Sequence, residues 1–290
     1  MDRKDFIKKS LLSAAALAAS KNLIKEKEEA STYDKLMNQV GFNHLPNHET
    51  KTVKSVLHKA NTRGHANHGW LDTHHTFSFA NYRNPERMNF GVLRVLNDDV
   101  VAGGRGFNTH PHDNMEIISI PLEGALQHED SMGNVAVIEQ GDVQVMSAGT
   151  GIYHSEKNKN SNAAVKFLQI WMFPNKKNVT PRYDQIKLEK TALQNQFFQV
   201  LSPSPDDEGV WAHQNAWFHI GYLEKGCDTT YTIKDKGNGV YAFILEGSVT
   251  IENQALEQRD GFGLWETEEI IITADSDAKV LLMDVPMQLG

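Results

Sequence analysis

Short apolar or alternating runs recur along the chain from Val53 onward, and turn-forming residues separate them. Examples in the first half are HTFSFANY, FGVLRVL, EIISIPL, VAVIEQGDVQVM and VKFLQIWMF. Alternation of apolar and polar residues with a period of two is typical of a strand with one buried face. The 3.6-residue period of an amphipathic helix is scarce in this sequence. The pattern therefore predicts an all-β chain whose strands close into barrels or sandwiches, because an open sheet edge can pair with other chains.

The strand-like runs form two series, separated by the proline-rich, acidic stretch SPSPDDEG at residues 202–209. The second series includes WFHIGYL, TTYTI, VYAFILEGSVTI, EIIITA and VLLMDVP. The chain has 290 residues, enough for two cores. We therefore expect two small antiparallel barrels, in domains at residues 53–185 and 186–290. The crossover lies in a polar segment near residues 180–195, where a helix is an alternative.

A short motif that occurs in both halves of the chain supports duplication of one barrel architecture. Leu-Glu-Gly ends a strand-like run both in PLEGAL at residues 121–126 and in ILEGSV at residues 244–249. A Gly/Asp turn then follows each of them, at Gly141-Asp142 and at Asp260-Gly261. The intervals differ, so the repeat is approximate.

The first twenty residues, MDRKDFIKKSLLSAAALAAS, predict an export signal. They have a basic start, a short apolar run and an Ala-x-Ala site at residues 16–18. Arg3 and Lys4 resemble a twin-arginine signal in which lysine replaces the second arginine. We expect export to the periplasm, with an uncleaved amphipathic helix of a cytoplasmic protein as the alternative. Residues 21–52 are polar and predict a tether.

The net charge, the apolar run and the cysteine content exclude several classes of ligand and partner. The chain has 29 basic and 37 acidic residues, for a net charge of -8, so nucleic acid is not expected as a ligand. The run of apolar residues in the signal is too short to span a bilayer, so no stable membrane insertion is expected. Cys227 is the single cysteine, which excludes an internal disulfide and a thiolate cluster. Any metal must bind to nitrogen and oxygen ligands. The oligomeric state is not predicted.

Two pairs of potential metal ligands occur at alternate positions. His110 and His112 in GFNTHPHDNMEII would point to one face of a strand, with Cα atoms roughly 7 Å apart. His154 and Glu156 in GTGIYHSEKN repeat this spacing. One such pair alone is more often an ordinary set of barrel residues, but two pairs beside glycines indicate a metal site. Three neutral imidazoles and one carboxylate leave room for substrate, as in catalytic sites.

Glu116 competes with Glu156 for the carboxylate position. An extended strand would place Glu116 about 13 Å from His112, so only a bend at Asp113-Asn114 would return it to the ion. Glu156 needs no such bend and is the expected ligand. Glu116 is then either a residue that orients a metal ligand by a hydrogen bond or a surface carboxylate at the end of a strand.

The remaining histidines and acidic residues are weaker candidates. RGHANHGWLDTHHTF contains His65, His68, His74 and His75, and a further histidine is His128. His75 could orient a metal ligand, and we expect His65, His68 and His74 to hydrogen-bond to loop backbone. A direct metal role is not expected for these histidines or for His128. The second barrel is expected to bind no metal. Its acidic segment with Glu266, Glu268 and Glu269 is read as an exposed turn, with a hard-cation site as the alternative.

Two motifs carry a resemblance to a known family. The segments G-x5-H-x-H-x3-E from Gly104 to Glu116 and G-x5-S-x-G-x4-H-x3-N from Gly141 to Asn158 resemble the two cupin motifs. Ser147 departs from them, since proline is usual there. More narrowly, THPHDNMEI, QHEDSMGN and MSAGTGIYHSE are similar to pirins, specifically the bacterial pirin-like quercetinases, and the resemblance runs from about Ser55 to Pro286.

The resemblance implies a bicupin with one metal ion in the N-terminal cupin. The family's three-histidine, one-glutamate set falls on His110, His112, His154 and Glu156. A redox-capable ion on such ligands suits joint binding of an oxidisable substrate and dioxygen. The family implies quercetin 2,3-dioxygenase activity, in which a flavonol opens with release of carbon monoxide and Glu156 acts as the catalytic base. Fe(II) is the expected ion, with Cu, Ni, Mn or Zn as alternatives.

Two other functions stay open at this point. Some pirins resemble redox-sensing partners of transcription regulators, so a metal-binding regulatory protein without turnover is the main alternative. An export signal would argue against it. A cupin isomerase acting on sugars is the other alternative, but the aromatic residues around the proposed site favour an aromatic substrate.

Overall fold

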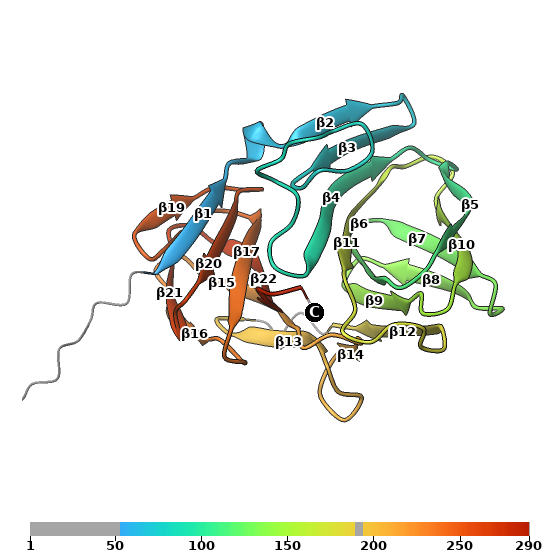
Figure 1. Cartoon of the computed structure of the whole chain (residues 1–290). Coiled ribbons are helices and arrows are strands. Elements are labelled where there is room, and N and C mark those ends of the chain that lie inside the picture. Colours follow the sequence, from blue (N-terminus) through green and yellow to red (C-terminus); the bar gives the residue numbers. More distant parts are fainter. Residues whose placement is uncertain (1–52, 189–193, 290) are drawn as a thin grey trace, which may run out of the picture. The chain divides into compact units, whose positions relative to one another are not determined.

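The computed structural model describes residues 53–188 and 194–289, which form strands β1 to β22 and one short 3-10 helix, η1 (Ala60–Thr62) (Figure 1). These residues contain no α-helix, so the all-β prediction is confirmed. In the same residues, no helix has the length and apolar character needed to cross a membrane. The predicted export signal at residues 1–20 and the predicted tether at residues 21–52 lie outside the described part of the chain.

The first barrel consists of two antiparallel sheets. The larger sheet contains, in spatial order, β12 (Arg182–Lys187), β9 (Asp142–Ser147), β6 (Glu116–Glu123), β11 (Val165–Met172), β4 (Leu93–Val101), β3 (Leu71–His75) and β2 (Gly64–Asn67). The smaller sheet contains β5 (Gly106–His112), β10 (Ile152–Asn158), β7 (Ala125–Asp130) and β8 (Val135–Glu139). In the polar segment predicted as the crossover, residues 182–187 form a strand and not a helix.

The second barrel repeats this arrangement. Its larger sheet contains β1 (Lys54–His58), β20 (Gly261–Trp265), β17 (Asn238–Glu246), β22 (Ala278–Pro286), β15 (Trp217–Leu223), β13 (Phe197–Ser202) and β14 (Val210–Trp211). Its smaller sheet contains β16 (Asp228–Thr232), β21 (Glu269–Ala274), β18 (Val249–Ile251) and β19 (Gln254–Leu256). β1 comes from the N-terminal side of the first barrel, yet it pairs with β20 along its whole length.

The two repeated sequence signals occupy equivalent turns. Gly124 follows β6 and Gly247 follows β17, and both adopt a positive φ, at 79° and 73°, which favours glycine. Asp142 and Asp260 each accept a hydrogen bond from the backbone N–H three residues earlier, at 2.8 and 2.9 Å. The Leu-Glu-Gly and Gly/Asp patterns thus mark the same two positions in both barrels.

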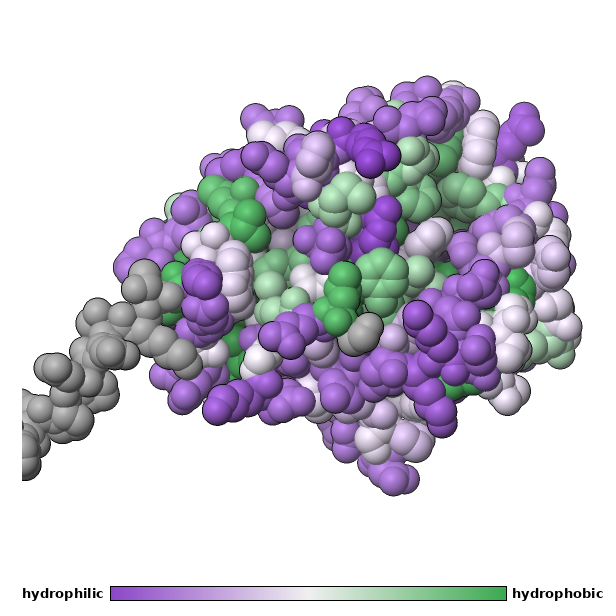
Figure 2. Space-filling model, viewed as in Figure 1, coloured by the Kyte–Doolittle hydropathy of each residue, from purple (hydrophilic) through white to green (hydrophobic). Residues whose placement is uncertain are grey.

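Apolar packing joins the barrels and fills them unequally. The largest buried cluster draws side chains from both larger sheets, including Ile118 and Ile170 from the first and Phe218 and Met283 from the second. The interior of the second barrel is filled by a further large cluster that includes Val240 and Ile270. The first barrel contains two smaller clusters, one around Phe167 and one that includes Ile117 and Met146, and a cavity lies inside it. The face shown in Figure 2 is mostly hydrophilic, with small groups of hydrophobic side chains interspersed.

Candidate metal centre

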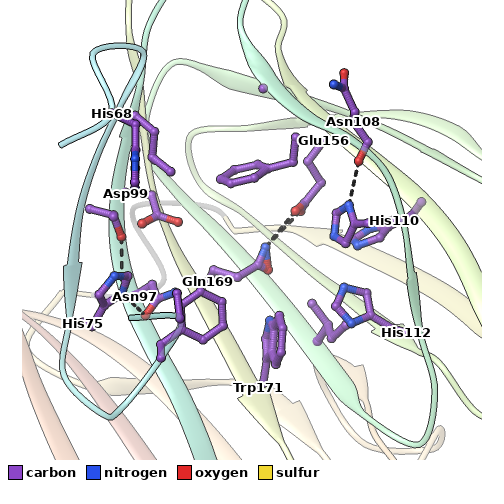
Figure 3. A pocket seen from close by; sticks show the side chains of 18 of the residues that line it. His68, His75, Asn97, Asp99, Asn108, His110, His112, Glu156, Gln169 and Trp171 are labelled. Carbon is purple, nitrogen blue, oxygen red and sulfur yellow. Dashed lines mark hydrogen bonds between the residues drawn. The ribbon is translucent and has the colours of Figure 1, made fainter. Parts of the chain in front are cut away.

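A cavity of about 550 Å³ opens inside the first barrel. This volume lies within the range of small-molecule sites. Strands β5 and β10 of the smaller sheet carry histidines along one wall, and strands β3, β4 and β11 of the larger sheet form the facing wall (Figure 3). The site therefore lies between the two sheets of the first barrel.

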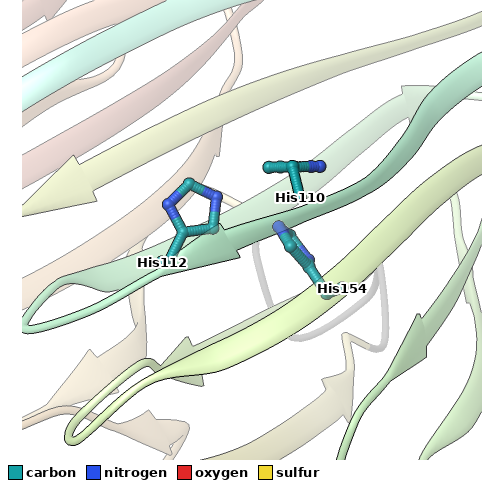
Figure 4. A group of neighbouring side chains, drawn as sticks. All are labelled: His110, His112 and His154. Carbon is teal, nitrogen blue, oxygen red and sulfur yellow. The ribbon is translucent and has the colours of Figure 1, made fainter.

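Three histidines converge on this cavity, as their spacing predicts. His110 and His112 lie two residues apart on β5, and His154 on β10 is the direct strand partner of His110. The ring centroids are 4.9 Å apart for His110 and His112, 4.4 Å for His110 and His154, and 5.0 Å for His112 and His154 (Figure 4). Strand pairing thus brings residues 44 positions apart in the sequence into contact.

The three imidazoles are arranged to offer nitrogen lone pairs. Burial lowers the pKa of His154 to about 3 and that of His112 to about 4, so both rings are neutral near pH 7. His110 Nδ1 lies 2.7 Å from the carbonyl oxygen of Asn108, and because a carbonyl only accepts, this nitrogen donates. The other nitrogen of His110 is therefore free to bind a metal.

The chemistry of this set fits a metal ion. His154 is 2% exposed, yet neither of its ring nitrogens has a hydrogen-bond partner. An unpaired buried nitrogen is unfavourable unless another partner occupies it. One nitrogen from each of His110, His112 and His154 lies within 4.8 Å of the others. Ligands on one ion are about 3 Å apart when metal–nitrogen bonds are near 2.0–2.1 Å, so modest ring rotations complete the site.

Glu156 lies on the same strand as His154 but points towards different partners. Its carboxylate accepts hydrogen bonds from Ser119 Oγ at 3.0 Å and from Gln169 Nε2 at 2.9 Å. A bulge between His154 and Glu156 shifts the pairing with β5. The carboxylate lies within 4.8 Å of nitrogens of His154 and His128 but does not group with His110 and His112. Its role as the fourth ligand stays a prediction.

His128 is closer to the site than the sequence indicated. It lies on β7 directly opposite Glu156, is 1% exposed, and its ring centroid is 5.3 Å from that of His154. Its Nε2 lies 3.1 Å from Asp130, and its Nδ1 has no partner. His128 therefore lies inside the barrel, next to His154. Only the alternation of QHED, which sets His128 and Asp130 on one face, pointed to this placement.

Glu116 and His75 are both buried, but only His75 lines the cavity. Glu116 is 1% exposed and accepts a hydrogen bond from Ser147 Oγ at 2.7 Å, so the surface reading of this residue is wrong. It does not line the cavity, whereas its neighbour Ile117 does, because alternate residues of β6 face opposite sides. His75 lines the cavity, and its Nδ1 lies 2.8 Å from Asn97 Oδ1.

His65 on β2 and His74 on β3 form a separate pair outside the cavity. His65 and His74 stack at 4.4 Å with an interplanar angle of 19°, and Asp72 Oδ1 lies 2.8 Å from His65 Nε2. Nearly parallel rings direct their lone pairs along separate planes, which does not suit a shared ion. His68 lines the cavity. In the second barrel, Glu266, Glu268 and Glu269 are exposed, and Glu266 pairs with Lys54 at 2.7 Å.

The second barrel contains a buried polar cluster of another kind. Tyr231 Oη donates to Asp284 Oδ2 at 3.0 Å and lies 3.3 Å from His219 Nδ1. Asn238 Nδ2 donates to Asp284 Oδ1 at 2.8 Å. These contacts satisfy the side chains internally, in contrast to the unpaired nitrogens of His154. That the second barrel binds no metal stays a prediction.

Family profiles match both barrels. The profile described as Pirin matches residues 55–172, and that described as Quercetinase C-terminal cupin domain matches residues 199–285. The chain thus has two cupin domains, and the bicupin prediction is confirmed. A quercetin 2,3-dioxygenase of Escherichia coli is 46% identical over 230 residues, covering 79% of this chain and 98% of the relative. A pirin-like protein of Caulobacter vibrioides is 38% identical over 76% of this chain and 95% of its own length.

Solved structures agree with these matches. A bacterial pirin of Escherichia coli in complex with nickel(II) has a TM-score of 0.76 and 44% identity, covering 80% of this chain and 99% of that one. A quercetin 2,3-dioxygenase of Acinetobacter baumannii shares the fold, with a TM-score of 0.64 at 21% identity, covering 80% of this chain and 86% of that one. The chain therefore belongs to the pirin family.

Proposed function

We propose that this protein is a metal-dependent dioxygenase that opens the central ring of flavonols such as quercetin and releases carbon monoxide. The observation that carries the proposal is the convergence of three imidazoles on a cavity large enough for a small aromatic molecule. The names of the relatives support quercetin as a member of the substrate class. The reaction uses one dioxygen, both of whose atoms enter the opened product, while one ring carbon leaves as carbon monoxide.

His110, His112 and His154 would hold one divalent metal ion, with Glu156 as the fourth ligand. When bound, the metal supplies positive charge that stabilises a deprotonated enol and a redox-active centre for dioxygen. We propose Fe(II) as the native ion, with Ni, Cu, Mn or Zn as alternatives. The Irving–Williams order favours several of these ions over Fe(II) at nitrogen ligands, so metal supply decides the occupant.

We propose that Glu156 also acts as the base. An oxygen of its carboxylate takes the proton of the flavonol 3-hydroxyl, since an enol must lose this proton before it can bind as an anion. Hydrogen bonds from Ser119 and Gln169 orient the carboxylate before the transfer. The histidines hold the ion and do not carry the proton.

Aromatic side chains make the cavity suitable for a planar substrate. Trp70 and Phe107 meet edge to face at 5.4 Å, and Phe79 and Trp171 do so at 5.4 Å with an interplanar angle of 87°. All four line the cavity, and Trp171 packs on His112 at 4.8 Å. They bind the substrate rings and exclude water from the reacting atoms. These contacts favour an aromatic substrate over a sugar.

The test is aerobic incubation of protein loaded with each candidate metal and quercetin, with oxygen uptake and carbon monoxide measured together. We expect equimolar consumption and release with at least one metal, and neither with His110→Ala. Turnover with no metal would reject the dioxygenase proposal. Oxygen uptake without carbon monoxide would reject the ring-opening chemistry.

We also propose that the protein is exported to the periplasm through the segment at residues 1–20. The basic start, the short apolar run and the Ala-x-Ala site support this proposal. N-terminal sequencing of the mature protein from cell fractions tests it. Finding only full-length protein, and only in the cytosol, would reject export and leave the regulatory alternative in place.

A further inference from the structure

A strip of buried polar side chains lies on the cavity wall that faces the histidines. It comes from three adjacent strands, because Asp99 on β4 pairs with Thr73 on β3, and Asn97 on β4 pairs with Gln169 on β11. All four side chains line the cavity and are no more than 6% exposed. Buried polar side chains in a barrel interior are unfavourable unless they are hydrogen-bonded.

Most of this strip is satisfied within the protein. Asn97 Oδ1 lies 2.8 Å from His75 Nδ1, and Gln169 Nε2 donates to Glu156. Thr73 hydrogen-bonds to the Asp99 carboxyl. The second oxygen of that carboxyl, Oδ1, has no partner, although Asp99 is only 4% exposed. Among the described residues that line the cavity, Asp99 and Glu156 are the carboxyl groups, and both oxygens of Glu156 already accept hydrogen bonds.

Asp99 lies across the cavity from His110 and His112 (Figure 3). Packed sheets are about 10 Å apart, which matches a substrate with one ring at the histidines and another at β4. Burial raises the pKa of Asp99 to about 7, so near neutrality the carboxyl can donate or accept a hydrogen bond. A phenolic hydroxyl also does both, which makes it a suitable partner.

We propose that Asp99 binds a phenolic hydroxyl of the substrate on the side of the cavity opposite the three histidines. The residue would make the protein select flavonols with hydroxyl groups beyond the one that meets the metal. This inference rests on the proposed function and adds a specificity determinant to it. A flavonol without that hydroxyl leaves Asp99 Oδ1 buried without a hydrogen-bond partner. This cost lowers the affinity for such a ligand. We expect a preference of about 10- to 100-fold in affinity.

The test compares two ligands and two proteins. Quercetin carries several phenolic hydroxyls, whereas 3-hydroxyflavone carries only the hydroxyl expected to meet the metal. Dissociation constants are measured by fluorescence titration of nickel-loaded, full-length protein without dioxygen, so that no turnover occurs. The wild type should bind quercetin about 10- to 100-fold more tightly. Asp99→Leu, which has a similar shape but no polar atoms, should remove that preference and leave 3-hydroxyflavone binding unchanged or tighter.

Asp72→Leu is the matched control. Asp72 is on β3, like Thr73, but it is 41% exposed and contacts His65 outside the cavity. This variant should keep the wild-type preference. If Asp99→Leu keeps the wild-type preference for quercetin, whether affinity falls equally for both ligands or for neither, the assignment of Asp99 is overturned.

A second measurement does not depend on the folding of a variant. The wild type is titrated with mono-methyl ethers of quercetin, each of which blocks one hydroxyl other than that at position 3. At least one ether should bind at least about tenfold more weakly than quercetin. If all bind as tightly, the inference fails while the dioxygenase proposal stands. If the wild type binds neither quercetin nor 3-hydroxyflavone, both proposals fail.

Discussion

His110 and His154 are direct partners across the antiparallel pair of β5 and β10, and their ring centroids lie 4.4 Å apart. The candidate metal site therefore depends on the register in which β5 and β10 pair. A slip of one residue would turn either histidine to the opposite face. The bulge that follows His154 leaves this pair in register and shifts the pairing of Glu156 and Lys157 with β5.

Replacing His154 with alanine should remove most of the bound metal. Loss of a residue that hydrogen-bonds to a metal ligand weakens metal affinity by about 10- to 100-fold. Loss of a ligand itself should weaken metal affinity by more than this. Metal content after dialysis against a weak chelator, measured by mass spectrometry, gives the result. His65→Ala is the control, because His65 is exposed and stacked on His74. Equal metal content in wild type and His154→Ala would contradict the site.

Gln169→Leu should weaken both metal binding and turnover without unfolding the protein. Its amide holds both oxygens of Glu156, at 3.1 and 2.9 Å, and leucine cannot replace these bonds. We expect metal affinity to fall by about 10- to 100-fold. Competition with a coloured chelator measures this, and Gln127→Leu on β7 is the control because its amide bonds to Glu129. Unchanged affinity and unchanged kcat in Gln169→Leu would remove Glu156 from the site.

Gly106→Ala should separate β5 from β10. A Cβ at Gly106 would overlap the carbonyl oxygen of Glu156 and the Cα of Lys157, so backbone must move. We expect a loss of about 1–3 kcal/mol in the free energy of unfolding, together with weaker metal binding. Urea unfolding of the metal-free protein gives the first value. Lys157→Ala, at the strand partner of Gly106, should change neither. A fully stable Gly106→Ala would mean that the strands are farther apart than described.

Glu116→Gln should raise stability at pH 8 but not at pH 4.5. Burial raises the pKa of Glu116 from 4.5 to about 7 in the folded protein. Between these values the unfolded chain releases the proton and the folded protein keeps it, so ionisation favours unfolding as pH rises. The cost is complete above pH 7 and absent below 4.5. Its size is on the order of 3 kcal/mol, and glutamine avoids it.

Urea unfolding of wild type and Glu116→Gln at both pH values measures this difference. Comparison with the wild type cancels the contributions of Asp99 and the buried histidines, which titrate in both proteins. Glu123→Gln serves as the control, since Glu123 is 60% exposed and pairs with Lys166 at the surface. A stability difference that is the same at pH 4.5 and pH 8 would show that Glu116 does not titrate as described.

The sequence was sufficient for the local part of the site. Alternation along a strand depends only on residue spacing, so the histidine pair at 110 and 112 and the direction of His154 followed from it. The duplicated turns could also be recognised, because glycine at positive φ and aspartate in a tight turn are local requirements.

Contacts that depend on the neighbours of each strand could not be predicted. Glu156 meets Gln169 because β10 faces β11 across the barrel, and no spacing in the sequence shows this. His128 enters the site through its register opposite Glu156. Glu116 is buried because its face of β6 packs towards the second barrel, where Ile118 joins the shared cluster. Asp99 has no distinguishing pattern in the sequence, because it is one of two adjacent aspartates in FGVLRVLNDDVV.

The pairing of β1 with β20 limits how this protein can be divided. A fragment that begins after β1 would deprive the C-terminal half of an outer strand and uncover the hydrogen-bonding groups of β20. A fragment that begins one residue later still would also lose Lys59, whose amino group lies 2.7 Å from Asp260. The second barrel thus includes a strand from the N-terminal end of the chain, so residues 186–290 alone lack part of its larger sheet. During synthesis, β1 emerges first from the ribosome but cannot pair until β20, near the C-terminal end, has been made.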